Sequence, residues 1–171
     1  EQQIAAFRID AAPVTNAVYL AFMEDGGYTR RDLWTEEGWT WLQEANVAAP
    51  KYWTHADGEW RVRSMDRVQP LSEVANHPVI HVCAHEADAC ARWQNKRLPT
   101  ELEWEAAACW DPGAGERRAY PWGDEPPTPL HANLDQLAFG TAPVGTFARN
   151  VSPIGCYGMI ADVCEWTSSE F

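Results

Sequence analysis

Three histidines recur at four-residue intervals and are the first candidates for metal chemistry: His77, His81 and His85. On a helix this spacing places two imidazoles on one face, within reach of a single metal ion. Pro78 and the β-branched residues after it instead predict a strand over residues 79–83. In such a strand the three histidines spread over about 26 Å at ~3.3 Å per residue. We therefore predict that they share no metal.

Two carboxylates near the end of the chain are the second candidates. Within residues 159–166, Asp162 and Glu165 are polar and all the remaining positions are apolar. This composition predicts that most of the segment is buried, and a buried carboxylate is costly unless it has a partner. The partner is a metal ion, an arginine such as Arg97, or a set of backbone amides, and the sequence leaves all three open.

The cysteines do not follow the spacing of a disulfide framework or a zinc site. There are five of them, an odd number, and no C-x-x-C occurs. Both features argue against structural cross-links. We predict reduced, mostly buried thiols at Cys83, Cys90, Cys109, Cys156 and Cys164.

Composition limits the class of protein. The chain has 171 residues with 46% apolar residues, enough for the core of one domain. Ten tryptophans, twelve prolines and eleven glycines indicate a loop-rich fold with an aromatic core. The net charge of −12 excludes nucleic acid and anionic membrane surfaces as partners. No apolar run approaches the roughly 20 residues of a membrane span, and we expect a cytoplasmic protein.

Short elements must position the candidate residues. Capping residues predict four helices, which begin after Thr15 or Asn16, after Asp32 or Thr35, at His85, and after Thr100, where Glu103 completes a capping box. Period-two or β-branched patterns predict strands at residues 7–10, 79–83 and 143–145, and a hairpin pairing 52–53 with 60–62. Trp34, Trp39 and Trp41 are predicted to be structural anchors rather than a base-stacking surface.

Six motifs occur in an order that resembles the formylglycine-generating-enzyme (sulfatase-modifying factor) family. They are PVTN (13–16), RLPTELEWE (97–105), YPWGD (120–124), ANL (132–134), PVG (143–145) and MIADVCEWT (159–167). The resemblance covers nearly the whole chain. It implies an α+β, C-type-lectin-like fold with few short helices and strands, which agrees with the loop-rich composition.

Further motifs are similar to one branch of that family. DGGY (25–28), LWTEEGWTW (33–41), PKYW (50–53) and WTSS (166–169) resemble the C-terminal domain of the non-haem iron sulfoxide synthases of ergothioneine and ovothiol biosynthesis. HPVIHV (77–82) is also similar to the related selenoneine synthase. The resemblance implies an Fe(II)- and O2-dependent oxidoreductase. Such an enzyme joins a thiol or selenosugar donor to the imidazole ring of hercynine through a C–S or C–Se bond.

The same resemblance implies that this chain does not carry the catalytic residues. In that branch an N-terminal four-helix domain holds the iron through histidines, and a later segment supplies a tyrosine and basic substrate contacts. No residue here matches either set. We expect residues 1–171 to be a partial lectin-like domain, a fragment that is inactive alone, with catalytic and substrate-binding residues outside it.

The family resemblance also implies calcium sites. One site corresponds to Asn133 and Leu134, with Asp135 beside them, and the other corresponds to Glu165. Hard oxygen ligands of this kind suit Ca²⁺. At the second site the family's other side-chain ligand falls on Gly158, which has no side chain.

Two positions depart from the branch pattern. Cys164 stands where the family usually has tryptophan, which predicts a loss of core volume. His85 stands where tyrosine is common and puts a titratable group near a helix start.

Two other functions remain as alternatives. One is a non-catalytic lectin-like binding module that displays variable loops. The other is a sulfatase-activating formylglycine-generating oxidase, whose copper-binding cysteine pair is not matched by Cys156 and Cys164.

Overall fold

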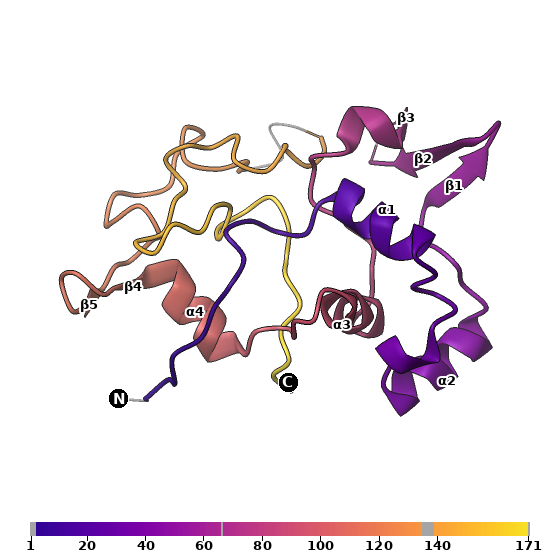
Figure 1. The fold of residues 1–171 in the computed structure, drawn as a ribbon. Coiled ribbons are helices and arrows are strands. Elements are labelled where there is room, and N and C mark those ends of the chain that lie inside the picture. Colours follow the sequence, from indigo (N-terminus) through magenta and orange to yellow (C-terminus); the bar gives the residue numbers. More distant parts are fainter. Residues whose placement is uncertain (1–2, 66, 135–138, 171) are drawn as a thin grey trace. The chain divides into compact units, whose positions relative to one another are not determined.

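The structure, a computed structural model, describes residues 3–65, 67–134 and 139–170 (Figure 1). The chain divides into two compact units. The central unit, named for its place in the sequence, is Val14–Leu98. The terminal unit comprises Glu1–Pro13 together with Pro99–Phe171. Among the described residues, no helix is long and apolar enough to cross a membrane.

Threonine side-chain caps set the starts of two helices in the central unit, as the sequence predicted. The Oγ1 atom of Thr15 accepts the Val18 N–H at 3.3 Å, and the Oγ1 atom of Thr35 accepts the Gly38 N–H at 3.0 Å. Each bond satisfies a backbone donor that has no partner within the helix. The helices are α1 (Asn16–Glu24), η1 (Arg31–Leu33), α2 (Glu36–Ala45), η2 (Leu71–Val74) and α3 (Ala84–Trp93).

The central unit also contains an antiparallel sheet of strands β1 (Trp53–Ala56), β2 (Glu59–Arg63) and β3 (Val68–Pro70), in that order. Asp57 and Gly58 join β1 to β2, and both have positive φ, 53° and 78°. A two-residue turn with two positive φ values matches the twist of a hairpin. The predicted hairpin is therefore confirmed.

The strand predicted over residues 79–83 is wrong. Pro78 makes only an isolated bridge to Thr15, and the Val79 N–H donates to the Val14 carbonyl at 2.9 Å. His81 then adopts φ +64°, which ends an extended run. Val79 and Val82 are half-buried and pack against the core instead of pairing in a strand ladder.

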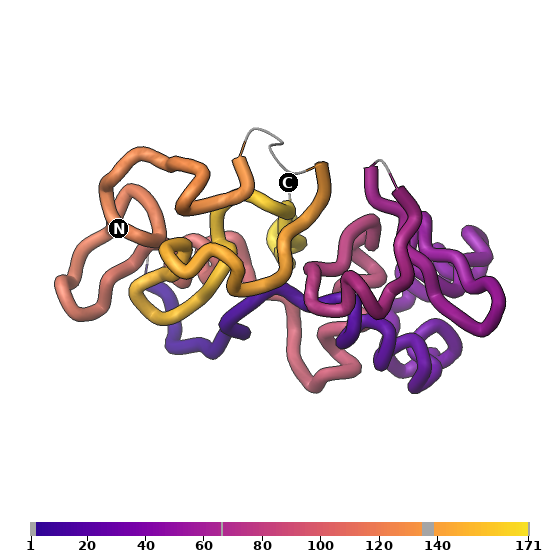
Figure 2. Tube along the Cα trace, turned by 90° about the horizontal axis from the view of Figure 1, so that it is seen from above, coloured from indigo at the N-terminus to yellow at the C-terminus, as the bar shows by residue number. Residues whose placement is uncertain are grey.

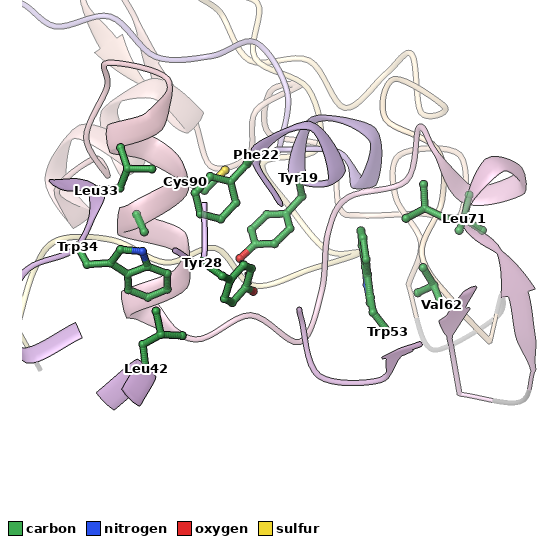
Figure 3. Close-up of a cluster of buried hydrophobic side chains, with 12 residues drawn as sticks. Tyr19, Phe22, Tyr28, Leu33, Trp34, Leu42, Trp53, Val62, Leu71 and Cys90 are labelled. Atoms are coloured by element: carbon green, nitrogen blue, oxygen red, sulfur yellow. Dashed lines mark hydrogen bonds between the residues drawn. The ribbon is translucent and has the colours of Figure 1, made fainter. Parts of the chain in front are cut away.

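An aromatic core fills the central unit (Figure 3). Phe22 is fully buried, and its ring lies 5.2 Å from that of Tyr19 between centroids. Gly27 is required beside it, because a Cβ atom at that position would come within 2.3 Å of the Phe22 ring. The predicted tryptophan anchors are confirmed: Trp34 is buried, and Trp39 and Trp41 pack against the same cluster.

The terminal unit has less regular structure, as the irregular orange and yellow tube of Figure 2 shows. Its elements are α4 (Glu101–Cys109), β4 (Trp110–Asp111) and β5 (Glu116–Arg117). The predicted capping box is confirmed: the Thr100 N–H donates to Glu103 at 2.8 Å, and the Glu103 N–H donates to Thr100 Oγ1 at 3.2 Å.

Small side chains form the core of the terminal unit. The cluster contains Ala107, Ala108, Cys109, Cys156 and Met159, with Phe7, Ile9 and Trp104 packed against it. The strands predicted at residues 7–10 and 143–145 are not formed. In the first, alternation identified residues that pack against the core but supplied no neighbouring strand for them.

All five cysteines are free thiols, as predicted. Cys90, Cys109 and Cys156 are buried, and burial raises the pKa of each of these thiols. Cys164 is exposed.

Candidate functional site

The C-terminal motif contains two consecutive left-handed residues, Ala161 with φ +62° and Asp162 with φ +66°. This conformation is disfavoured for residues that carry a Cβ atom, so it persists only where the surroundings hold it. The Asp162 carboxylate accepts the Ala142 N–H at 3.0 and 3.1 Å and the Asn133 amide at 2.8 Å. We call these residues the Asp162 clamp, together with Gly140, whose carbonyl accepts Asn133 Nδ2 at 2.9 Å.

The Asp162 clamp answers one question that the sequence left open. Of the three possible partners for this carboxylate, the structure supplies amides, one from the backbone and one from a side chain. The carboxylate joins the C-terminal motif to a loop about 20 residues earlier. It thus stabilises a region with little regular secondary structure.

The predicted calcium ligands are placed as follows. Both hydrogens of Asn133 Nδ2 are used, by Gly140 and Asp162, which leaves Oδ1 as the amide atom able to ligate a cation. Leu134 is half-buried. Asp135 lies outside the described residues. The donor chemistry at Asn133 therefore fits a hard cation, and the calcium assignment stays a prediction.

Glu165 lies in a different hydrogen-bond group. Its Oε2 atom accepts the Trp104 Nε1–H at 3.3 Å. The side chain as a whole is exposed, but nearby protein atoms partly desolvate the carboxyl group. This desolvation raises the pKa of Glu165, and the Trp104 hydrogen bond opposes the rise.

The prediction that the C-terminal motif is mostly buried is wrong for its last part. Met159 is buried and residues 160–163 are half-buried, but Cys164, Glu165 and Trp166 are exposed. The predicted loss of core volume at Cys164 is wrong for the same reason, because an exposed side chain fills no core.

The three spaced histidines do not define a metal centre. Within residues 3–65, 67–134 and 139–170, no group of three or more His, Cys, Asp or Glu side chains could hold a metal ion. The His81 ring instead contacts Tyr52 at 4.9 Å, and the His85 ring lies 5.8 Å from Trp41. Desolvation and the Lys51 charge lower the pKa of His81. None of the described residues corresponds to the iron-binding histidines that the family resemblance implies.

Sequence reasoning missed a buried polar chain in the central unit. Tyr28 donates its hydroxyl hydrogen to Glu86 at 2.5 Å, and the Tyr19 hydroxyl lies 3.0 Å from that of Tyr28. Tyr28 and Glu86 are 58 residues apart in the sequence. No local pattern signals such a pair.

A three-ring stack in the terminal unit was also missed. Trp122 lies between Tyr120 and His131, with centroid distances of 5.3 and 4.6 Å and nearly parallel planes. His131 is buried, and its Nδ1 atom accepts the Thr128 N–H at 3.2 Å. This bond places the proton of the neutral imidazole on Nε2. The PWGD motif thus has a structural role as a stacked anchor.

Comparison with known families now gives the class of protein. Residues 1–171 match the FGE-sulfatase family, described as the sulfatase-modifying factor enzyme 1-like domain. The chain therefore belongs to this family. The fold is α+β and C-type-lectin-like, with few short helices and small sheets, as the sequence predicted.

Individual relatives narrow the comparison. The chain is 45% identical over 166 residues to the hercynine oxygenase of Mycolicibacterium thermoresistibile, covering 97% of this chain and 36% of that protein. The hercynine oxygenase of Mycobacterium tuberculosis is also 45% identical, with 38% of its length covered. The formylglycine-generating enzyme of Thermomonospora curvata is 32% identical over 96% of this chain and 60% of its own length. The chain thus spans little more than a third of the hercynine oxygenases.

Proposed function

We propose that this chain is the lectin-like domain of a non-haem Fe(II)- and O2-dependent synthase acting on hercynine. The reaction joins a thiol or selenosugar donor to the imidazole ring through a C–S or C–Se bond. The observation that carries the proposal is the 45% identity to hercynine oxygenases over 97% of the chain. The identity to formylglycine-generating enzymes is 32 to 34%.

The chemistry that bound Fe(II) supplies is the activation of O2, and we place its ligands in a separate N-terminal helical domain. The residues of this chain have a supporting role in the proposal. The Asp162 clamp holds the C-terminal motif in a conformation that leaves Glu165 and Trp166 exposed. We propose that this exposed part of the motif lies against the remaining catalytic segments of the protein.

Oxygen uptake by the complete gene product tests this function. The protein loaded with Fe(II) is mixed with hercynine and either cysteine or a selenosugar, and O2 is followed with an electrode. We expect uptake that requires hercynine together with one donor, and a product whose mass contains both. Uptake that is unchanged when hercynine is left out would contradict the proposal.

Calcium is a second part of the proposal, resting on the amide orientation at Asn133. Its Oδ1 atom and the Leu134 carbonyl are the proposed ligands, and Glu165 belongs to a separate site. Calcium titration with a thermal-melting readout should raise the unfolding temperature, and Asn133→Ala should remove that shift. Asn95→Ala, in the central unit, is the control. An equal calcium shift in all three proteins would argue against the site.

Formylglycine generation is the alternative enzymatic function, and relatives with that name match up to 99% of the chain. Its support is weaker because Cys156 is buried in the terminal core whereas Cys164 is exposed. Mass spectrometry of a cysteine-containing sulfatase peptide after incubation distinguishes the two reactions. Conversion of that cysteine to formylglycine would favour the alternative.

A further inference from the structure

The hydroxyl group of Tyr28 lies in a buried hydrogen-bond chain. Figure 3 shows two of its members, Tyr19 and Tyr28, in the aromatic core. It donates to Glu86 Oε1 at 2.5 Å, and the Tyr19 hydroxyl lies at 3.0 Å. The three side chains belong to buried residues, with relative exposures of 1% for Tyr19, 8% for Tyr28 and 4% for Glu86. The Glu86 carboxylate thus faces the Tyr28 hydroxyl in a site that excludes most water.

Glu86 is arranged to accept a proton from Tyr28. Its other oxygen, Oε2, accepts the Cys83 N–H at 2.7 Å. Glu86 Oε2 and the Cys83 nitrogen lie at the start of α3, where the helix dipole favours a negative charge. Each carboxylate oxygen therefore already accepts one hydrogen bond, and Oε1 faces a phenol.

The direction of the second hydrogen bond follows from the first. Tyr28 has one hydroxyl hydrogen, which goes to Glu86, so Tyr19 donates to the Tyr28 oxygen. Burial and the nearby Glu86 charge raise the pKa of Tyr28. Tyr28 therefore remains a protonated phenol until it loses an electron. At that point its proton has an acceptor, and its oxygen keeps the hydrogen bond from Tyr19.

Aromatic rings connect this pair to the edges of the central-unit core. On one side Trp53 lies 6.1 Å from the Tyr19 ring, and Trp60 lies 6.1 Å beyond it. On the other side Trp34 lies 5.8 Å from the Tyr28 ring, and Trp41 lies 6.4 Å further. Trp60 and Trp41 are half-buried, so the rings form a chain between two partly exposed ends.

The tryptophans in the interior of this chain have no comparable proton acceptor. Trp34 donates its indole hydrogen to the Gly27 carbonyl at 2.8 Å, and a carbonyl is a weak base. The Trp53 indole nitrogen has no hydrogen-bond partner within the part of the chain that the structure describes. Oxidation of either ring leaves a radical cation that keeps its proton. Among Tyr28, Trp34 and Trp53, the exchangeable hydrogen of Tyr28 is the one that is bonded to a carboxylate.

We propose that Tyr28 and Glu86 form a one-electron redox site that the flanking tryptophans connect to the protein surface. The oxidant is a strong one-electron acceptor, either metal-centred or photogenerated, and it gains one electron. Tyr28 loses that electron while its O–H bond breaks, and the proton forms a new O–H bond on Glu86 Oε1. The products are a neutral Tyr28 radical, a neutral Glu86 carboxylic acid and the reduced acceptor. The site does not depend on the proposed function, because any such oxidant serves.

Photochemical oxidation of the complete gene product tests this site. A ruthenium(II) tris-bipyridine sensitiser with persulfate produces the oxidant in a flash, and freeze-quenched samples are examined by electron paramagnetic resonance. We expect a neutral tyrosyl radical that outlives the flash in the wild-type protein. Ring-deuterated tyrosine should narrow its hyperfine pattern. Tyr28→Phe should abolish this long-lived signal.

Matched variants separate Tyr28 from the other tyrosines. Tyr52→Phe changes an exposed residue and should leave the signal unchanged. Tyr19→Phe removes the hydrogen bond to the Tyr28 oxygen and should shorten the lifetime without abolishing the radical. Glu86→Gln removes the proton acceptor and should slow radical formation. Circular dichroism in the near ultraviolet confirms that each variant is folded.

The wild-type protein provides a second readout in case Tyr28→Phe fails to fold. A radical on Tyr28 has hydrogen-bonded protons from Tyr19 and Glu86 that exchange slowly in D2O, since all three residues are buried. Electron–nuclear double resonance soon after transfer to D2O should still detect them. Immediate loss of those couplings, or a signal that disappears in Tyr52→Phe but not in Tyr28→Phe, would overturn the proposal.

Discussion

The central unit buries aromatic rings between helices and sheet, whereas the terminal unit packs alanines, two thiols and a methionine beside α4. The central unit has five helices and three strands in its described residues; the terminal unit holds long loops through side-chain bonds to the backbone, as at Asp162 and Asn150. One chain thus uses two means of stabilisation. Packing should dominate the response to mutation in the first unit and polar contacts in the second.

The largest expected effect is in the aromatic core. Phe22→Ala removes a fully buried ring and should lower the free energy of unfolding by about 3–5 kcal/mol. Urea denaturation measures the change. Val18→Ala, on a more exposed position of the same helix, is the control and should stay within about 0.5 kcal/mol. A loss at Phe22 no larger than that of the control would contradict the packing account.

The next effect is in the Asp162 clamp. Asp162→Ala leaves the Ala142 N–H and the Asn133 amide without their acceptor and should cost about 1–3 kcal/mol. Asp162→Asn should cost less, because asparagine tolerates the left-handed conformation and retains one carbonyl oxygen. Comparison of both variants by urea denaturation separates the hydrogen bonds from the backbone strain. Equal losses would mean that the negative charge itself carries the stabilisation.

A smaller effect is expected at the start of α4. Thr100→Ala removes half of the capping box and should cost about 1 kcal/mol. Thr40→Ala is the matched control, since Thr40 bonds back to the Glu36 carbonyl within α2 and caps no helix end. Thermal or urea unfolding of the two variants gives the difference. A cost at Thr40 equal to that at Thr100 would remove the cap as the explanation.

The smallest effect concerns pH. Desolvation raises the pKa of Glu165 in the folded protein, so the folded state binds this proton more tightly than the unfolded state. Its contribution to stability therefore falls as pH rises from the usual glutamate pKa of 4.5 through the raised value. Glu165→Gln should remove that part of the pH dependence. A wild-type-minus-variant difference that rises over this range would have the wrong sign.

Locally determined features were predictable from the sequence. Thr15, Thr35 and Thr100 each place a hydroxyl before a helical segment, and each is a cap in the structure. The hairpin at Asp57 and Gly58 was equally predictable, because a two-residue turn with positive φ favours particular residues. These predictions succeed because a capping or turn residue and the backbone that it shapes lie within a few positions of each other in the sequence.

Features that depend on distant partners were not predictable. The strand predicted over residues 7–10 has its apolar residues against the core but no neighbouring strand. The Tyr28–Glu86 pair joins residues far apart in the sequence. The apolar composition of the C-terminal motif suggested burial, yet Cys164 and Trp166 are exposed. In each case the sequence shows which side chains are apolar or polar, but it does not show which distant residues they contact.

The contrast between the units also bears on the function. The central unit carries the proposed redox site in its packed core, and the terminal unit carries the exposed motif at Glu165 and Trp166. The family match covers both units, and so does the 45% identity to hercynine oxygenases. The proposal of a hercynine-dependent synthase is the claim that connects both units to one reaction.

A competition assay tests that claim most directly. The complete gene product, loaded with Fe(II), is given hercynine, a thiol donor and a cysteine-containing sulfatase peptide in one vessel under air, and all products are measured by mass spectrometry. We predict that hercynine acquires the donor sulfur while the peptide cysteine stays unchanged. Conversion of the peptide cysteine to formylglycine with unmodified hercynine would contradict the account.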